Sequence, residues 1–218
     1  KTATAFQKEQ YSRQILEQLL KLQFCDPAEC PMIKDKVFDE KVLLWETSYF
    51  LERFVARVCG VEGDFTDVKE EFKQLAQEVN DLPKAIMHRD FQSENIMVKN
   101  KQVWFIDFQG AHWGTPFYDA VSFLRDPYTS FPENDELRQT YLTKLGERLQ
   151  MSVEACERAY NLCGLQRHMQ ALGAYGFLAK IRGKEWFLDH AVAGLEMLTR
   201  DLAYFDDEFP ALKNLLAT

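Results

Sequence analysis

Glycine, closely spaced cysteine pairs and long apolar runs are scarce in this chain. Each scarcity limits the classes of protein to which the chain can belong. No apolar run approaches the ~18 residues that a membrane-spanning helix needs, and no stretch has the pattern of a secretory signal peptide. Only Gly60 and Gly63 occur before residue 88, so this part contains no G-x-G-x-x-G loop of the kind that covers nucleotide phosphates in kinases. A membrane is therefore not an expected partner, and a glycine-rich phosphate loop is missing from the sequence.

The cysteines show neither a C-x-x-C spacing nor an even number. They are Cys25, Cys30, Cys59, Cys156 and Cys163. Free, buried thiols are the expected state, and a disulfide or a zinc site is the alternative. Free thiols suit a reducing compartment, so the expected location is the cytoplasm.

The charge balance excludes polyanionic partners. The formal net charge is −8 and the pI is about 5.1, so the surface repels nucleic acid and anionic membranes. An anionic nucleotide would need local help from Mg²⁺ or basic groups. A hydrophobic content of 46% over 218 residues predicts a globular chain with a sizeable core, arranged as one domain or two small lobes.

One stretch carries a chemical pattern. It reads His88-Arg89-Asp90-Phe91-Gln92-Ser93-Glu94-Asn95 and is followed by Ile106-Asp107-Phe108. An aspartate, an asparagine five residues later and a second aspartate after an apolar run are typical of phosphoryl transfer. This chemistry needs one carboxylate to receive the acceptor's proton and two oxygen ligands to hold Mg²⁺. The alternative is a solvated surface hairpin in which the acids are incidental.

The residues between Asn95 and Asp107 predict a β-hairpin. Two short β-favouring runs, 96–98 and 103–106, flank a polar turn at residues 99–102. A hairpin centred on Lys101 would place Asn95 and Asp107 opposite each other at its open end, as a shared metal site requires. Asp90 lies just outside the hairpin, where it could face an acceptor.

The rest of the chain has helical periodicity. Helices are predicted at residues 1–24, 39–58, 67–80, 118–125, 136–150, 153–175 and onward, and 191–204. Residues 110–116 are predicted to form a loop, and the acids at 206–208 a solvated tail. Gly173 and Gly176 either weaken their helix or permit close packing against it.

This pattern predicts a mainly α fold with one small catalytic β-hairpin, which is the C-terminal lobe of a kinase-like protein. A complete kinase also has a strand-rich lobe that covers the nucleotide. We expect that lobe to be absent from residues 1–218, through truncation or proteolysis, and we expect these residues to form a single kinase-like lobe that is inactive alone.

The motifs around Asp107 resemble those of the aminoglycoside phosphotransferase/choline kinase-like superfamily. They are Ile106-Asp107-Phe108-Gln109-Gly110-Ala111, Gly114, Pro116, Tyr118-Asp119 and Asp126-Pro127-Tyr128. The D-F-G and A-P-E motifs of eukaryotic protein kinases do not occur. Residues 164–173 and the segment 39–58 are similar to those of the bacterial N-acetylmuramate/N-acetylglucosamine anomeric sugar kinases. The resemblance covers nearly the whole chain.

The resemblance implies a role for each residue of the motif. Asp90 corresponds to the catalytic base, and Asn95 and Asp107 correspond to the ligands of Mg²⁺ that hold the nucleotide. His88 and Asp119 correspond to residues that support the catalytic loop.

Four further residues are candidates for contact with substrate. Arg89 either pairs with an acid or faces a phosphate, and His112 either lines a sugar site or packs the loop. Arg167 is either structural or substrate-facing. Gln109 replaces an acid that is frequent in the superfamily, although glutamine suits the sugar-kinase subgroup.

The function implied is transfer of the γ-phosphate of ATP to a hydroxyl of a small molecule, with Mg²⁺ as cofactor. The expected acceptor is the anomeric hydroxyl of an amino sugar. Two alternatives stay open: a kinase for another alcohol, such as an aminoglycoside or choline, and a catalytically silent kinase-like binding module.

Overall fold

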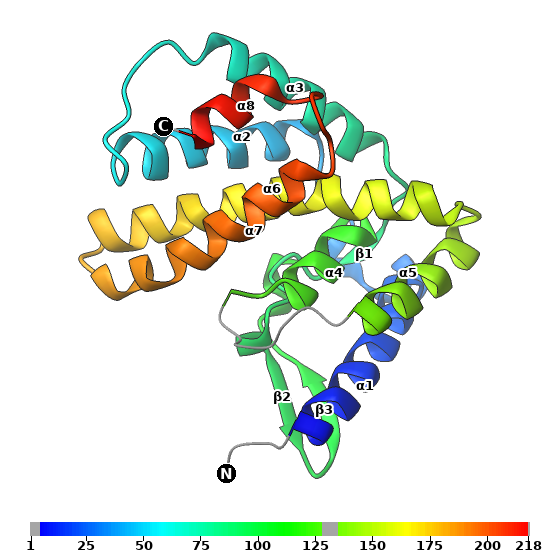
Figure 1. The fold of residues 1–218 in the computed structure, drawn as a ribbon. Helices are drawn as coiled ribbons and strands as arrows, with labels where there is room; N and C mark the ends of the chain where they lie inside the picture. The colour runs from blue at the N-terminus through cyan, green and yellow to red at the C-terminus, as the bar shows by residue number, and fades with distance from the viewer. Residues whose placement is uncertain (1–4, 128–134, 218) are drawn as a thin grey trace. The chain divides into compact units, whose positions relative to one another are not determined.

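A computed structural model describes residues 5–127 and 135–217, most of which are helical (Figure 1). The chain divides into two compact units. The first combines Lys1–Val37 with Pro83–Tyr160, and the second combines Phe38–Leu82 with Asn161–Thr218. The long helix α6 (Val153–Lys180) therefore contributes residues to both. Among the described helices, none is long and apolar enough to cross a membrane.

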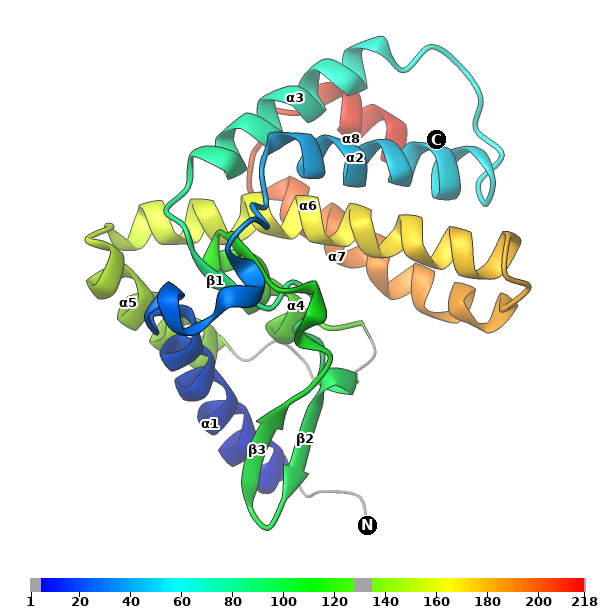
Figure 2. The same ribbon diagram turned by 180° about the vertical axis from the view of Figure 1, so that it is seen from behind.

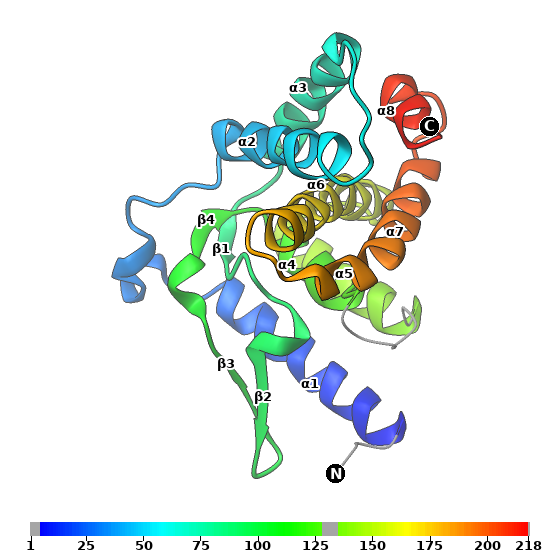
Figure 3. The same ribbon diagram turned by 90° about the vertical axis from the view of Figure 1, so that its left-hand side faces the viewer.

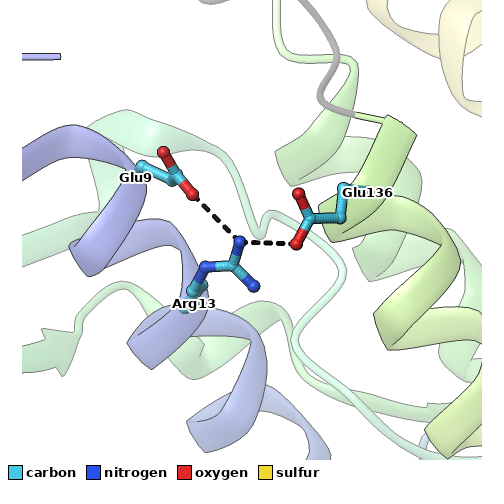
Figure 4. Close-up of polar contacts among 3 residues, drawn as sticks. All are labelled: Glu9, Arg13 and Glu136. Atoms are coloured by element: carbon cyan, nitrogen blue, oxygen red, sulfur yellow. Dashed lines mark hydrogen bonds and ion pairs between the residues drawn. The ribbon is translucent and has the colours of Figure 1, made fainter. Parts of the chain in front are cut away.

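Helices α1 (Ala5–Gln23) and α5 (Asp135–Leu149) lie side by side in the first unit (Figures 1 and 2). Arg13 of α1 joins them through ion pairs of 2.9 Å to Glu136 of α5 and to Glu9 of its own helix (Figure 4). All three side chains are well exposed, so this contact orients the two helices more than it stabilises them.

A buried contact ties the end of α1 to α4 (Pro116–Leu124). The Gln23 amide donates to the carbonyl of Pro116 at 3.0 Å, and its oxygen accepts the Tyr141 hydroxyl proton at 2.7 Å. Burial raises the pKa of Tyr141, which therefore stays a neutral donor. This network fixes the start of α4, the helix that carries Asp119.

The predicted hairpin consists of β2 (Ile96–Lys99) and β3 (Gln102–Phe105), and Figure 3 shows it beside α1. Its turn residues, Asn100 and Lys101, both have positive φ, at 52° and 62°. Two such residues form the type I′ turn, whose twist matches that of the paired strands.

The register differs from the expected one. A two-residue turn places the symmetry axis between Asn100 and Lys101, half a residue before the predicted centre, so the predicted pairing was wrong by one position. Asn95 therefore lies opposite Ile106, whose N–H donates to the Asn95 carbonyl at 3.0 Å. Asp107 follows as the next residue along the chain.

A second small sheet was not predicted. Strand β1 (Ala85–Met87) pairs antiparallel with β4 (His112–Gly114), in a segment that was expected to be a loop. The backbone of Lys36 extends the pairing, because its carbonyl accepts the Trp113 N–H at 2.8 Å. Strand β4 forms because partners distant in sequence satisfy its backbone groups.

Helices, joined by turns and loops, are the regular elements described in the second unit. It contains α2 (Glu40–Phe50), a π-helical continuation at Leu51–Ala56, α3 (Thr66–Asp81), α7 (Ala191–Ala203) and α8 (Pro210–Leu216). Asp39 caps α2 by accepting the Val42 N–H at 3.1 Å. The helices predicted at 39–58, 67–80 and 191–204 agree within two residues at each end with α2 and its continuation, α3 and α7. The first four residues of the helix predicted at 1–24 lie outside the described part.

Helix α8 was not predicted, because the last helix predicted from the sequence ends at residue 204. The acids at 206–208 are exposed as expected, but a helix follows them and packs on α3 (Figures 1 and 2). The Glu71 carboxylate of α3 accepts the N–H groups of Ala211 and Leu212 at 2.7 and 2.8 Å. A carboxylate from a distant helix thus caps this short helix.

Gly173 and Gly176 permit close packing, which is the second of the two alternatives. A Cβ at Gly176 would lie 2.1 Å from the carbonyl oxygen of Arg53, and one at Gly173 would lie 2.8 Å from the ring of Tyr49. The backbones of α6 and of residues 49–54 therefore approach too closely for any side chain at these two positions.

Candidate active site

The loop that carries Asp90 is anchored by a buried carboxylate. Asp119 of α4 is fully buried and accepts the N–H of His88 at 2.6 Å and that of Arg89 at 2.9 Å. Hydrogen bonds to a charged acceptor are among the stronger ones in proteins. They hold Arg89 at a φ of 75°, which is uncommon for a residue other than glycine. Asp90 follows directly, so its position is set by this strained residue.

A second buried acid, Asp126, holds the far end of the same loop. It accepts the Ser93 N–H at 2.7 Å at the start of the 3₁₀ turn Ser93–Asn95. Sequence reasoning treated the Asp126-Pro127 pair only as a helix stop and as part of a family motif. Its neighbour Tyr128, which belongs to that motif, lies outside the described residues.

The Asn95 side chain is tied to the backbone of Asp90. Its amide nitrogen donates to the Asp90 carbonyl at 2.8 Å, so the amide oxygen points away from that carbonyl. Asp107 is exposed and has a φ of 64°. One of its carboxylate oxygens accepts a hydrogen bond from the side-chain amide of Gln109.

The oxygen donors of Asn95 and Asp107 fit Mg²⁺, which prefers hard oxygen ligands. Within residues 5–127 and 135–217, no group of three or more His, Cys, Asp or Glu side chains forms a metal site. With only two protein ligands, the remaining ligands of a Mg²⁺ ion would be phosphates and water, as is usual for Mg²⁺ in kinases.

His88 connects the loop to the end of the hairpin. It is buried, and its Nε2–H donates to the Ile106 carbonyl at 2.9 Å. Its Nδ1 has no hydrogen-bond partner in the described part of the chain. Burial lowers the pKa of His88, so the ring is neutral at pH 7. Its edge-on contact with Phe91, at 5.6 Å between centroids, gives it a packing role.

Gly110 lies against the carboxylate of Asp90. A Cβ at Gly110 would stand 3.0 Å from Asp90 Oδ2, so only glycine leaves that carboxylate undisturbed. The Gly110 carbonyl accepts a hydrogen bond from His112 Nδ1 at 2.6 Å. Trp113 packs on the small apolar cluster of Ile33, Ile86 and Ala111. The segment from Gly110 to Trp113 is therefore held at both of its ends.

Lys36 is a site residue that sequence reasoning missed. Its Nζ donates to the Gln109 carbonyl at 2.8 Å, across 73 residues of sequence. Burial is the main cause that lowers the pKa of His112, and the charges of Arg89 and Lys36 lower it further. Lys36 and Arg89 thus place two basic groups near His112, beside the acidic Asp90. No local pattern marked Lys36, because a tertiary contact alone brings it here.

A family model provides the decisive comparison. The model described as the phosphotransferase enzyme family matches residues 2–160, which include the whole loop and both of its buried anchors. The chain belongs to this family. The resemblance seen in the motifs is thereby confirmed.

Three curated relatives within this family are named N-acetylmuramate/N-acetylglucosamine kinase. The protein of Pseudomonas putida is 29% identical over 79% of this chain and 52% of its own length. That of Pseudomonas aeruginosa is 30% identical over 69% and 47%, and that of Neisseria meningitidis serogroup B is 30% identical over 75% and 51%. The chain thus spans about half the length of the curated relatives it matches.

Solved structures confirm the kinase-like fold. A choline/ethanolamine kinase family protein from Mesorhizobium loti matches with a TM-score of 0.57 and 15% identity, over 94% of this chain and 65% of that one. The structure of a gentamicin–APH(2″)-IIa complex matches with a TM-score of 0.55 and 15% identity, over 90% and 66%. At such identities the likeness shows the fold alone.

Arg167 lies in the second unit and is almost fully buried. Its Nη1 donates to the side-chain oxygen of Gln170 at 2.6 Å. The next residue, His168, forms a buried 2.6 Å contact with Asp201 of α7. These contacts favour the structural alternative for Arg167, and contact with substrate stays a prediction.

Proposed function

We propose that the whole protein containing these residues transfers the γ-phosphate of ATP to the anomeric hydroxyl of an amino sugar. The observation that carries the proposal is the hydrogen bond from the Asn95 side chain to the Asp90 carbonyl. It joins one candidate proton acceptor and one candidate Mg²⁺ ligand in a single loop, which Asp119 and Asp126 anchor at its two ends. Membership of the phosphotransferase enzyme family supports the reaction type.

Each residue of the loop has a role in this proposal. Asp90 accepts the proton of the attacking hydroxyl, and Asn95 and Asp107 hold Mg²⁺. The metal, when bound, neutralises charge on the phosphates. Asp119 and His88 do not touch the reacting atoms; they keep the Asp90 carboxylate in place, and positioning supplies much of the catalysis in phosphoryl transfer.

The charges beside His112 are mixed. Lys36 and Arg89 both act on His112, which lies close enough to Asp90 to feel its charge as well. Because the basic Lys36 and Arg89 and the acidic Asp90 lie together there, charge alone does not distinguish a cationic acceptor from a neutral or acidic one. The printed names of the curated relatives support an amino sugar as the acceptor.

A substrate panel with the whole protein tests the proposal. Release of ADP is measured with N-acetylmuramate, N-acetylglucosamine, an aminoglycoside and choline, and ³¹P NMR identifies the product. We expect turnover with the amino sugars and a phosphate resonance coupled to the anomeric proton. Turnover of choline or the aminoglycoside alone would favour the other alcohol kinases. ATP binding without turnover of any acceptor would favour a silent binding module.

A further inference from the structure

Cys25 and Cys30 flank a short turn that follows α1. Asp26 caps the turn, the 3₁₀ segment Pro27–Glu29 forms it, and the Cys30 N–H closes it by donating to the Pro27 carbonyl at 3.0 Å. The thiol of Cys25 donates to the Leu22 carbonyl at 3.1 Å. The chain therefore reverses between the two cysteines, and their side chains can meet on one side of the turn.

Both cysteines pack on the same apolar cluster. Its centre is formed by Ile33, Ile86 and Ala111, and both half-buried cysteine side chains lie against it. Burial raises the pKa of the Cys25 thiol, and the neighbouring Cys30 raises it further. Because both side chains contact this one small cluster, Cys25 and Cys30 are neighbours in the folded chain, and both are free thiols.

The other three cysteines occupy different surroundings. Cys59 is exposed near the end of the π-helical segment, whereas Cys156 and Cys163 are buried in α6. Cys25 and Cys30 are separated by a turn that is already formed, so little chain ordering is needed to join them.

We propose that Cys25 and Cys30 form a reversible disulfide when a disulfide oxidant such as glutathione disulfide is present. One thiolate attacks the oxidant, releases one glutathione thiol and forms a mixed disulfide. The second thiolate then displaces the remaining glutathione and forms the Cys25–Cys30 bond. Two protein thiols lose two electrons and two protons, and the oxidant becomes two thiols.

The surroundings favour the oxidised product over the charged intermediate. Apolar surroundings destabilise a charged thiolate but not a neutral disulfide, so the cluster favours the disulfide. The cross-link would lie on the segment that leads to Lys36, which bonds the Gln109 carbonyl and the Trp113 N–H beside the candidate active site. The proposal concerns thiol chemistry and does not depend on the proposed function.

Mass spectrometry of residues 1–218 tests the disulfide directly. The folded chain is treated with glutathione disulfide, alkylated and digested, and the peptides that contain Cys25 and Cys30 are compared before and after dithiothreitol. We expect Cys25 and Cys30 to be linked to each other and unalkylated, with a mass lower by two hydrogens. After reduction, both cysteines should become alkylated. Unlinked peptides in which both cysteines are alkylated, or carry stable glutathione adducts, would overturn the proposal.

Serine variants give matched controls. Cys25→Ser and Cys30→Ser should each abolish the link and leave the remaining thiol open to alkylation or to a glutathione adduct. Cys59→Ser should leave the Cys25–Cys30 link intact, because Cys59 is exposed and far from the turn in sequence. The wild-type measurement decides the proposal even if a variant folds poorly. A link in the wild-type chain that instead joins either cysteine to Cys59 would contradict it.

Discussion

The side-chain amide of Asn95 donates a hydrogen bond of 2.8 Å to the main-chain carbonyl of Asp90. The same carbonyl accepts the Gln92 N–H at 3.0 Å, so the loop closes on itself. The candidate metal ligand and the candidate base are therefore fixed relative to each other by local bonds. Because Asp119 and Asp126 hold the two ends of the loop, its geometry does not rely on a bound substrate.

Asp119→Ala tests the anchor of this loop. The substitution leaves the N–H groups of His88 and Arg89 without their acceptor, and each buried unsatisfied donor costs about 1–3 kcal/mol. The free energy of unfolding, measured in urea at neutral pH, should fall by roughly 2–5 kcal/mol. Glu94→Ala is the control, because Glu94 is an exposed acid of the same loop and should change stability by less than about 0.5 kcal/mol. Equal stability of the two variants would show that Asp119 does not support the loop.

Gly176→Ala tests the close packing in the second unit. Alanine favours a helix by about 1 kcal/mol over glycine, so helix propensity alone predicts a gain in stability. Here the added Cβ meets the Arg53 carbonyl at 2.1 Å, and overpacking against backbone should cost about 1–3 kcal/mol or more. The thermal unfolding midpoint should therefore drop. Gly63→Ala, with no described atom within 4 Å of the added Cβ, should leave it nearly unchanged. A raised midpoint for Gly176→Ala would contradict the packing.

Local patterns predicted the helices well. Apolar periodicity and caps such as Asp39 act within a few residues, so they can be read directly from the sequence. The hairpin was also predicted, but its register was not. The reason is physical: the left-handed conformations of Asn100 and Lys101 decide where the strands begin, and a polar turn sequence does not specify them uniquely.

Elements that depend on long-range contacts could not be predicted from local sequence patterns. The pairing of β1 with β4 joins three-residue strands that have no periodicity of their own. Helix α8 depends on Glu71, which lies 140 residues from Ala211 in sequence. In the candidate site, the motif residues could be predicted because their chemistry requires a fixed spacing. Lys36 acts through a tertiary contact with the backbone, which leaves no spacing to recognise. Asp126 was noticed only as part of a family motif, and its contact with Ser93 was not predicted.

The buried imidazole of His88 predicts a pH dependence of stability. Burial lowers the pKa of both His88 and His112, whereas an unfolded imidazole titrates near pH ~6.5. Below that pH the unfolded chain takes up protons that the folded chain resists. The free energy of unfolding should therefore be level above about pH 7 and should fall as the pH drops from about 6.5 toward the lower folded-state pKa values. In urea titrations across this range, His88→Gln should show a shallower fall. An unchanged slope would mean that His88 does not contribute.

Residues 1–218 alone should bind MgATP weakly, because the sequence contains no glycine-rich loop to cover the phosphates. We expect a Kd of about 1 mM or weaker, which corresponds to a binding free energy of about −4 kcal/mol. Calorimetric titration measures it, with the whole protein titrated in parallel. Micromolar binding by residues 1–218 would show that the loop and hairpin suffice to hold the nucleotide.

The kcat of Asp90→Asn in the whole protein, measured on its own acceptor at saturating MgATP, tests the central claim most directly. The substitution keeps the shape of the side chain and removes the proton acceptor, and general-base catalysis contributes roughly 10²–10⁴-fold. We expect kcat to fall by about that factor while the affinity for MgATP stays nearly unchanged. Asp107→Asn is the matched comparison: it should weaken Mg²⁺ binding, and excess Mg²⁺ should partly restore its activity. An Asp90→Asn variant that retains near wild-type kcat would contradict the assignment of Asp90 as the base and the mechanism built on it.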